Sequence, residues 1–140
     1  MNKNGEIIII EDDEDDLFLF EEVFKELNYS IKRLYCATGE DALNYLHDPK
    51  CDPFVLLSDI NIPYLNGFDL KQKLETEAEI NVRLVPYLFF STAAIQQHVI
   101  DAYSRSIQGF FIKSSDFEDL KNTIEIIVSY WKMCAAPNTR

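Results

Sequence analysis

Side chains able to do chemistry stand at the ends of four apolar runs of this sequence. They are carboxylates, hydroxyls and an amine: Glu11 and Asp12, then Asp59, then Ser91 and Thr92, and last Lys113. A carboxylate nucleophile beside a cation, a hydroxyl and an ammonium can position a phosphoryl group and neutralise its developing charge. Ser91 alone would be explained by helix capping and Lys113 alone by a surface ion pair, but their joint occurrence predicts a phosphoryl-transfer site.

The acidic segment after the first run suits a hard cation. If the first and third strands are neighbours, Glu11 and Asp12 lie near Asp59, and three carboxylates in one pocket are costly unless a cation neutralises them. Mg²⁺ takes one or two carboxylates and keeps several waters, so we interpret Asp12 with Asp59 as a metal site. For the acidic residues that follow, interaction with the dipole of the first helix is the better explanation: Asp13, Glu14, Asp15 and Asp16.

These residues need a sheet whose strand ends meet at one edge. Apolar runs rich in Ile, Val, Leu and Phe alternate with segments of helical period, which is typical of an α/β fold with a parallel sheet covered on both faces. In such a sheet, ligands bind beyond the carboxyl ends of the strands. We expect strands near residues 6–10, 31–36, 54–59, 84–90 and 108–112, with helices between them.

Two of the expected helices carry clear apolar stripes. The stripes are Leu17, Phe20, Phe24 and Leu27 in the first helix, and Phe117, Leu120, Ile124, Ile127 and Trp131 in the last. Asp116 is expected to cap the last helix, with Asp119 in the capping-box position. We expect one domain over residues 1–140, with a core of residues 6–133 and a frayed tail of residues 135–140.

Composition limits the possible functions. A net charge of −11, from 24 acidic and 13 basic residues, argues against nucleic acid as a partner. The sequence has neither a secretory signal nor an apolar stretch of roughly 18 residues, so we expect a soluble, cytoplasmic protein. Cys36, Cys51 and Cys134 follow no disulfide or zinc pattern, and we interpret His47 and His98 as surface or boundary residues.

Four motifs resemble, in order and spacing, those of the CheY-like receiver domains of response regulators. The motifs are Ile7 to Asp13, Asp59-Ile-Asn-Ile-Pro63 with Gly67, Pro86 to Ser91, and Lys113. The resemblance implies a doubly wound, five-stranded parallel sheet in the order 2-1-3-4-5 with five helices. It also implies a single-domain response regulator of a two-component or phosphorelay system, which is a signalling protein and not a metabolic enzyme.

The resemblance assigns metal and phosphoryl chemistry to particular residues. Asp59 would accept a phosphoryl group from a histidine kinase in a Mg²⁺-dependent reaction. Asp12 would bind the Mg²⁺ directly and Glu11 through water. The backbone carbonyl of Asn61 would be the third protein contact of the metal.

The same resemblance assigns the response to phosphorylation. Ser91 would bind the phosphoryl group, and Lys113 would be its counter-charge. Phe110 falls where the family carries an aromatic residue that turns inward when the hydroxyl is drawn toward the phosphate. A static core aromatic is the alternative interpretation of Phe110.

The implied partners are proteins: a sensor histidine kinase or phosphotransfer protein, and a downstream target. The chain itself would act as a monomer or as a phosphorylation-dependent homodimer. Tyr103, Tyr130 and Trp131 are candidates for a partner surface, with partial burial as the alternative. A receiver-shaped interaction module that takes no phosphate is the alternative function. A phosphatase of the haloacid-dehalogenase type fits less well, because Asn61 stands where that class needs a second aspartate.

Three positions depart from the family pattern. Ser114 follows Lys113 where the family usually has a proline after a cis bond, so we expect a different loop there. Thr92 replaces the more usual Ala or Gly at the mouth of the pocket, which bears on access of water or of a phosphatase. Ser106 and Ile107 replace a Gly-Ala pair, so we expect the preceding helix to end differently.

Overall fold

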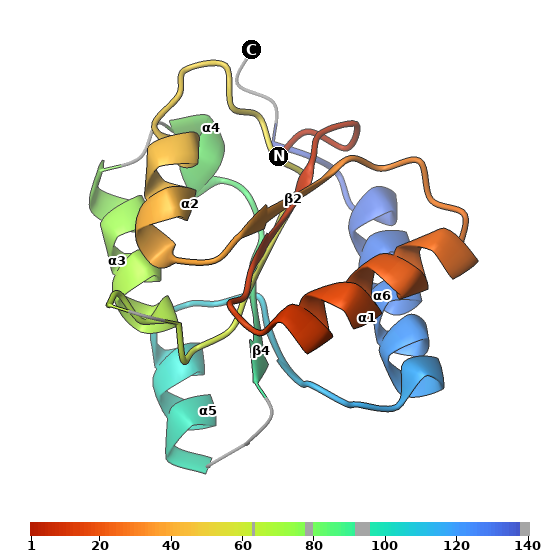
Figure 1. Ribbon diagram of the computed structural model, residues 1–140. Helices are drawn as coiled ribbons and strands as arrows, with labels where there is room; N and C mark the ends of the chain where they lie inside the picture. Colours follow the sequence, from red (N-terminus) through yellow and green to blue (C-terminus); the bar gives the residue numbers. More distant parts are fainter. Residues whose placement is uncertain (63, 78–79, 92–95, 138–140) are drawn as a thin grey trace.

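A single parallel sheet forms the centre of the molecule. The computed structural model describes residues 1–62, 64–77, 80–91 and 96–137 (Figure 1). The strands in this part of the chain are β1 (Ile7–Ile10), β2 (Arg33–Cys36), β3 (Val55–Ser58), β4 (Tyr87–Ser91) and β5 (Gly109–Ile112). Their order is β2-β1-β3-β4-β5, so the predicted topology is confirmed and β1 and β3 are neighbours.

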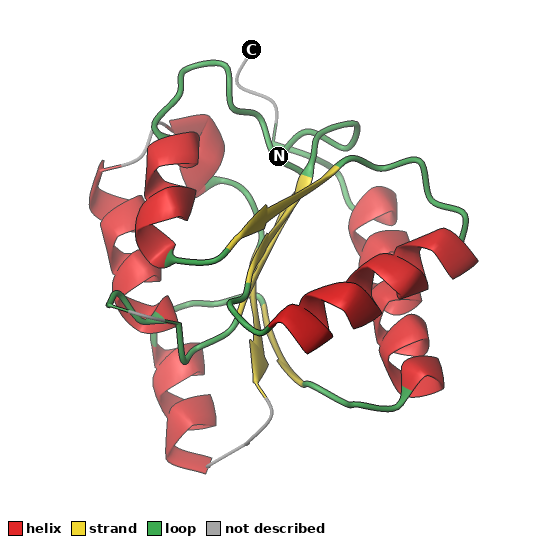
Figure 2. Ribbon diagram, viewed as in Figure 1, coloured by secondary structure: helices red, strands yellow, loops and turns green. Residues whose placement is uncertain are grey.

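Helices cover both faces of this sheet (Figure 2). One face carries α1 (Glu14–Glu26) and α6 (Phe117–Met133), and the other carries α2 (Gly39–Leu46), α3 (Gly67–Glu77) and α5 (Gln96–Ser104). These are the five helices expected, and a single short turn, α4 (Ile80–Arg83), follows α3. None of the helices described combines the length and the apolar character needed to span a bilayer.

Alternate residues of β1 enter two separate cores. Ile8 and Ile10 pack in one core, which includes Leu70 of α3, whereas Ile7 and Ile9 pack in the other. Successive side chains of a strand point to opposite faces, so a strand that is apolar at every position fits a sheet buried on both sides. The apolar runs therefore predicted this layering correctly.

The predicted helix stripes face the second core. Their fully buried members are Phe20, Phe24, Leu120, Ile124 and Ile127, and their partly buried members are Leu17, Leu27, Phe117 and Trp131. Both stripes are confirmed, and together they pack α1 and α6 against the same face of the sheet. Of the two histidines, His47 is exposed and His98 is partly buried, as interpreted.

Strand bounds differ from the expected ones by up to three residues. The largest difference is at β4, which begins at Tyr87 because Leu84 is 38% exposed and lies outside the sheet. Pro86 has no N–H to donate, although its carbonyl accepts a hydrogen bond from the Leu56 N–H at 3.0 Å. Proline therefore stands just before the strand and not within it.

The caps of the last helix are only partly as expected. Asp116 is the N-cap of α6, and its carboxylate accepts from the Glu118 N–H at 2.9 Å. The capping box with Asp119 is wrong, because the Asp116 N–H donates to the Ser114 hydroxyl instead, at 3.0 Å. Ser114, at the position where the resemblance leads one to expect proline, thus shapes the loop after β5.

Two other chain segments differ from expectation in physically informative ways. After α5, Ser106 has a left-handed φ of 58°, the conformation that glycine adopts without strain, so the helix end keeps a glycine-like backbone although the residue is serine. In the tail, Ala136 packs against the second core and the Pro137 carbonyl accepts from the Met1 amine at 3.4 Å. The first residues of the expected tail are therefore in contact with the fold, and residues 138–140 lie outside the described part.

Candidate functional site

The carboxyl ends of the strands bring the predicted site residues to one edge of the sheet. The Asp59 N–H donates to the Ile10 carbonyl at 3.0 Å, which places the end of β3 beside the end of β1. On the other side, the Lys113 N–H donates to the Ser91 carbonyl at 2.8 Å, which joins the ends of β4 and β5. Backbone hydrogen bonds of the sheet thus fix the spacing of Asp59, Ser91 and Lys113.

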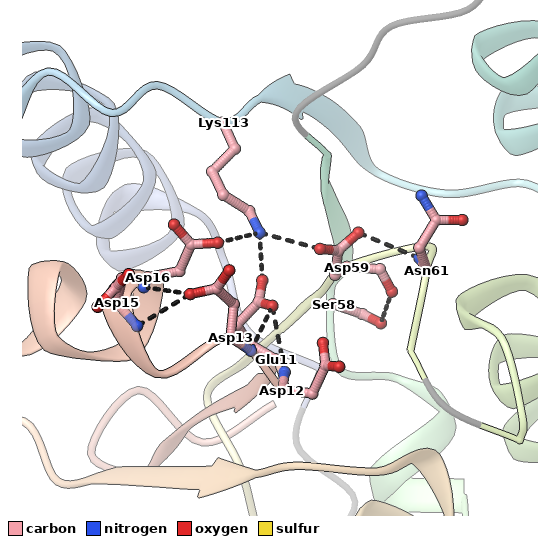
Figure 3. A network of polar contacts seen from close by, with 9 residues as sticks. All are labelled: Glu11, Asp12, Asp13, Asp15, Asp16, Ser58, Asp59, Asn61 and Lys113. Atoms are coloured by element: carbon pink, nitrogen blue, oxygen red, sulfur yellow. Dashed lines mark hydrogen bonds and ion pairs between the residues drawn. The ribbon is translucent and has the colours of Figure 1, made fainter.

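The Lys113 ammonium is the centre of the site. Its Nζ lies 2.9 Å from Asp59 Oδ2 and 2.9 Å from Asp16 Oδ2, and it also contacts the Glu11 carboxylate (Figure 3). The Lys113 side chain is only 4% exposed. Burial alone would lower the pKa of this ammonium, but the hydrogen bonds with Glu11, Asp59 and Asp16 outweigh burial and raise it. Lys113 is therefore a permanently charged group in a nearly dry position.

Glu11 joins this ammonium to the backbone at the start of α1. Its Oε1 accepts from the N–H groups of Asp12 and Asp13, both at 3.1 Å, while its Oε2 contacts Lys113. Burial raises the pKa of the Glu11 carboxyl to about 7, against the opposing effect of the Lys113 hydrogen bond. Both oxygens of Glu11 thus have protein partners. Because the backbone fixes the Glu11 carboxylate, that carboxylate holds the Lys113 ammonium next to Asp59.

Asp59 and Asp12 differ in how much of their bonding capacity is used. Asp59 Oδ2 pairs with Lys113, and Oδ1 accepts from the Asn61 N–H at 3.1 Å. The Asp59 side chain is still 11% exposed, so a small reactant can reach it. Asp12 is exposed, and within the described residues its carboxylate has no hydrogen bond or ion pair. The Asp12 carboxylate is therefore free to take a ligand from solution.

Asp16 belongs to the site although its sequence position did not indicate this. It lies in the first turn of α1, as the interpretation through the helix dipole requires, but its carboxylate also contacts Lys113, which the sequence did not show. The same interpretation suits Asp13, which is the N-cap of α1 and accepts from the N–H groups of Asp15 and Asp16. The signal that was available is this cap, since it places Asp16 in the first turn, beside the end of β1.

A second group that the sequence did not reveal supports the loop after Asp59. The Tyr87 hydroxyl, which is fully buried, donates to the Gly67 carbonyl at 3.1 Å, and the Gly67 N–H donates to the Ile60 carbonyl at 2.9 Å. The Ser58 hydroxyl donates to the Asp59 carbonyl at 2.8 Å. These bonds hold the β3–α3 connection, and hence Asp59, against the start of α3.

The remaining predicted residues lie where the strands place them. Ser91 is buried at the end of β4. Phe110 is partly buried, with its ring centroid 6.2 Å from that of Phe89 in the first core. Thr92 and Pro63, both singled out in the sequence, lie outside the described residues.

Metal-binding side chains are not gathered into a ready-made cluster. Across the residues that the structure describes, no three His, Cys, Asp or Glu side chains are arranged as ligands of one ion. The ammonium of Lys113 lies between the carboxylates of Glu11 and Asp59 instead. Of the pair expected from the sequence, Asp12 is exposed and has no partner among the described residues, whereas Asp59 is paired with Lys113.

Comparisons with known proteins agree with this architecture. The chain is 27% identical over 129 residues to "Probable methanogenesis regulatory protein FilR2" of Methanothrix harundinacea, covering 89% of this chain and 82% of that protein. Its fold superposes on the phosphorylated cyanobacterial phytochrome response regulator RcpA with a TM-score of 0.84, at 18% identity over 96% of this chain and 99% of RcpA.

A third relative was solved with a metal. It is the receiver domain of the sensor histidine kinase PA1611 from Pseudomonas aeruginosa, which has a magnesium ion in its active-site cleft. The TM-score is 0.75, at 19% identity over 94% of this chain and 99% of that domain. The sequence profile of the response regulator receiver domain matches residues 7–125, most of the chain. The chain therefore belongs to the response regulator receiver domain family of two-component systems.

Proposed function

We propose that this receiver domain is a phosphorylation switch that accepts a phosphoryl group on Asp59 with the help of Mg²⁺. The observation that carries the proposal is the Lys113 ammonium, which is buried and lies 2.9 Å from Asp59 Oδ2. A positive charge held at this distance can neutralise the charge that develops when a carboxylate oxygen attacks phosphorus. An ordinary surface ion pair joins one lysine to one carboxylate, whereas the buried Lys113 contacts three carboxylates.

The reaction moves one phosphoryl group between two nucleophiles. An Asp59 carboxylate oxygen attacks the phosphorus of a phosphohistidine, the phosphorus–nitrogen bond breaks, and the imidazole leaves with the bonding pair and takes up a proton. The product is an acyl phosphate on Asp59. Lys113 would neutralise the phosphoryl oxygens, and Ser91, which is buried at the end of β4, would donate its hydroxyl to one of them.

The side chains fit a magnesium ion by their chemistry. The carboxylates of Asp12 and Asp59 would hold it directly, with the Asn61 backbone carbonyl as a third contact and Glu11 acting through water. The support for this is the exposed Asp12 carboxylate, which has no partner among the described residues. The ion would supply positive charge for the phosphoryl oxygens, and the magnesium seen in the PA1611 receiver domain agrees with this choice of metal.

The output of the switch would be a change in protein contacts. Phe110 packs beside Phe89 against the first core, and it would move inward when Ser91 is drawn toward the phosphoryl group. Tyr103 of α5 and Tyr130 of α6 are 55% and 59% exposed, on helices that cover opposite faces of the sheet, whereas Trp131 is partly buried. These exposed tyrosines would contribute to binding a downstream protein or a second copy of the chain in the cytoplasm.

The donor would be a sensor histidine kinase or a phosphotransfer protein. The acidic surface, with 24 acidic against 13 basic residues, fits such a protein partner better than a nucleic acid. Sedimentation with and without a phosphoryl mimic tests the homodimer, and a monomer under both conditions would rule it out.

Intact-mass measurement tests the switch itself. The wild-type protein, Asp59→Asn and the control Asp69→Asn are incubated with acetyl phosphate, with and without Mg²⁺. Asp69 is an exposed carboxylate in the first turn of α3, so its substitution removes the same charge away from Lys113. We expect a phosphoryl-sized gain in the wild type and Asp69→Asn only with Mg²⁺, and none in Asp59→Asn. No gain in any protein would favour an interaction module that takes no phosphate.

A further inference from the structure

Lys113 is bound by three carboxylates, and the proposed function engages two of them elsewhere. Of the three, Asp59 would hold the metal directly and accept the phosphoryl group, and Glu11 would contact the metal through water. A divalent cation on these carboxylates weakens their attraction for the ammonium and repels it directly. Something else has to keep Lys113 in the pocket while the metal is bound.

Asp16 is placed to do this. Its Oδ2 lies 2.9 Å from Lys113 Nζ, and Figure 3 shows Asp16 on the opposite side of the ammonium from Asp59. It comes from α1 and not from a strand end, so it need not move when the strand-end groups rearrange. Its side chain is 26% exposed, compared with 3% for Glu11, so its charge costs less to maintain.

The backbone of Asp16 is also fixed independently of the metal. Its N–H donates to Asp13 Oδ1 at 3.2 Å, as part of the cap that begins α1. The same turn carries Asp15, which is exposed and has the same charge, but no contact joins it to Lys113. Asp16 is therefore distinguished from the acidic residues around it by geometry and not by charge.

We propose that Asp16 is a positioning residue, which holds the Lys113 ammonium beside Asp59 when Mg²⁺ occupies the carboxylates of the site. The inference rests on the proposed function, because it assumes that Mg²⁺ binds at Asp12 and Asp59. Asp16 touches neither the metal nor the phosphoryl group; it acts through Lys113. Its loss should matter most in the metal-bound state, since Glu11 and Asp59 still hold the ammonium when no metal is present.

The test compares Asp16→Asn with Asp15→Asn, which removes the same charge from the same turn. The first measurement is the side-chain ammonium resonance of Lys113 by ¹⁵N NMR, recorded without Mg²⁺ and with saturating Mg²⁺. We expect the resonance in all proteins without the metal, and its broadening or loss in Asp16→Asn alone once Mg²⁺ is added. Calorimetry with Mg²⁺ should give the same reduction in affinity for both variants, because each loses one nearby charge.

The second measurement is the rate of phosphorylation at saturating Mg²⁺ and acetyl phosphate. We expect Asp16→Asn to be slower than Asp15→Asn by about tenfold, the effect of losing one charge-assisted hydrogen bond. Asp16→Glu, which keeps the charge, should recover part of the rate. A simple folding defect would not produce this pattern, since it would also appear in the metal-free spectrum and in thermal unfolding.

The outcomes separate this inference from the proposed function. If the resonance and the rate of Asp16→Asn match those of Asp15→Asn, Asp16 has no positioning role, although the switch itself stands. If the wild type takes up no phosphoryl group, the proposed function fails. The Mg²⁺ dependence of the Lys113 resonance then still decides whether Asp16 holds the ammonium.

Discussion

Gly67, the first residue of α3, lies closer to the Asp59 loop than any side chain would allow. A Cβ at this position would be 2.7 Å from the Asp59 carbonyl oxygen and 2.7 Å from Cε1 of Phe89. The first of these atoms is backbone and the second belongs to a fully buried ring, so neither can move aside cheaply. We therefore expect Gly67→Ala to destabilise the fold and to displace Asp59.

The size of the effect follows from the overlap. Forcing an extra methyl group into a packed interior costs about 1–3 kcal/mol, and at the first helical position alanine regains little of this through helix propensity. With an unfolding entropy of about 2.1 cal/mol/K per residue, a loss of about 2 kcal/mol lowers the melting temperature of a domain this size by about 7 °C. Phosphorylation of Asp59 should also slow, because its carbonyl is pushed from the position fixed by Ser58.

The control is Gly109→Ala, at another buried glycine. There the added Cβ would meet only side-chain atoms, the nearest being Phe111 Cε2 at 3.1 Å and Leu88 Cδ2 at 3.2 Å. These atoms can yield, so we expect a change within about 1 kcal/mol. Urea unfolding of both variants measures the difference. Equal stability of the two variants would show that the approach of α3 to Asp59 places no constraint on residue 67.

Three further substitutions test other parts of the structure by the same unfolding measurement. Ser106→Gly should stabilise the fold by about 0.5–1 kcal/mol, because Ser106 has a φ of 58° that glycine adopts without strain; a loss of stability would contradict this. Tyr87→Phe should cost about 1–2 kcal/mol, since the Gly67 carbonyl loses a buried donor, and no cost would mean that this bond is dispensable. Asp116→Ala should cost about 1 kcal/mol through loss of the α6 cap, with Asp119→Ala as a control that changes little.

The sheet was the part of the fold that the sequence predicted best, for a simple physical reason. A strand such as Ile7–Ile10, buried on both faces, has to be apolar at every position, and this pattern is visible without any tertiary information. The ends of the strands are harder to predict from the sequence, because the apolar runs continue beyond them. Leu84 belongs to the apolar run but not to the strand, and only the packing around α4 and Pro86 decides this.

The sequence predicted which residues lie at the site, but not which carboxylates contact the Lys113 ammonium. Strand-end position alone pointed to Asp59 and Lys113, because parallel strands bring their carboxyl ends to one edge. It could not show which carboxylates Lys113 reaches, since a lysine side chain is long and flexible and α1 enters at an angle set by its cap at Asp13. Asp16 was therefore assigned to the helix dipole, although it contacts the ammonium.

The charges of this network suggest an order of events. Three carboxylates contact Lys113, and Asp12 adds a fourth nearby, so one ammonium faces a clear excess of negative charge. A phosphoryl donor, itself an anion, is repelled by this site until a cation reduces the excess. Mg²⁺ should therefore bind before the donor and without help from it. Lys113 is already shared among three carboxylates, so it should not be enough to attract the donor, and we expect phosphorylation to need the metal although the proposed phosphoacceptor lies beside a buried lysine.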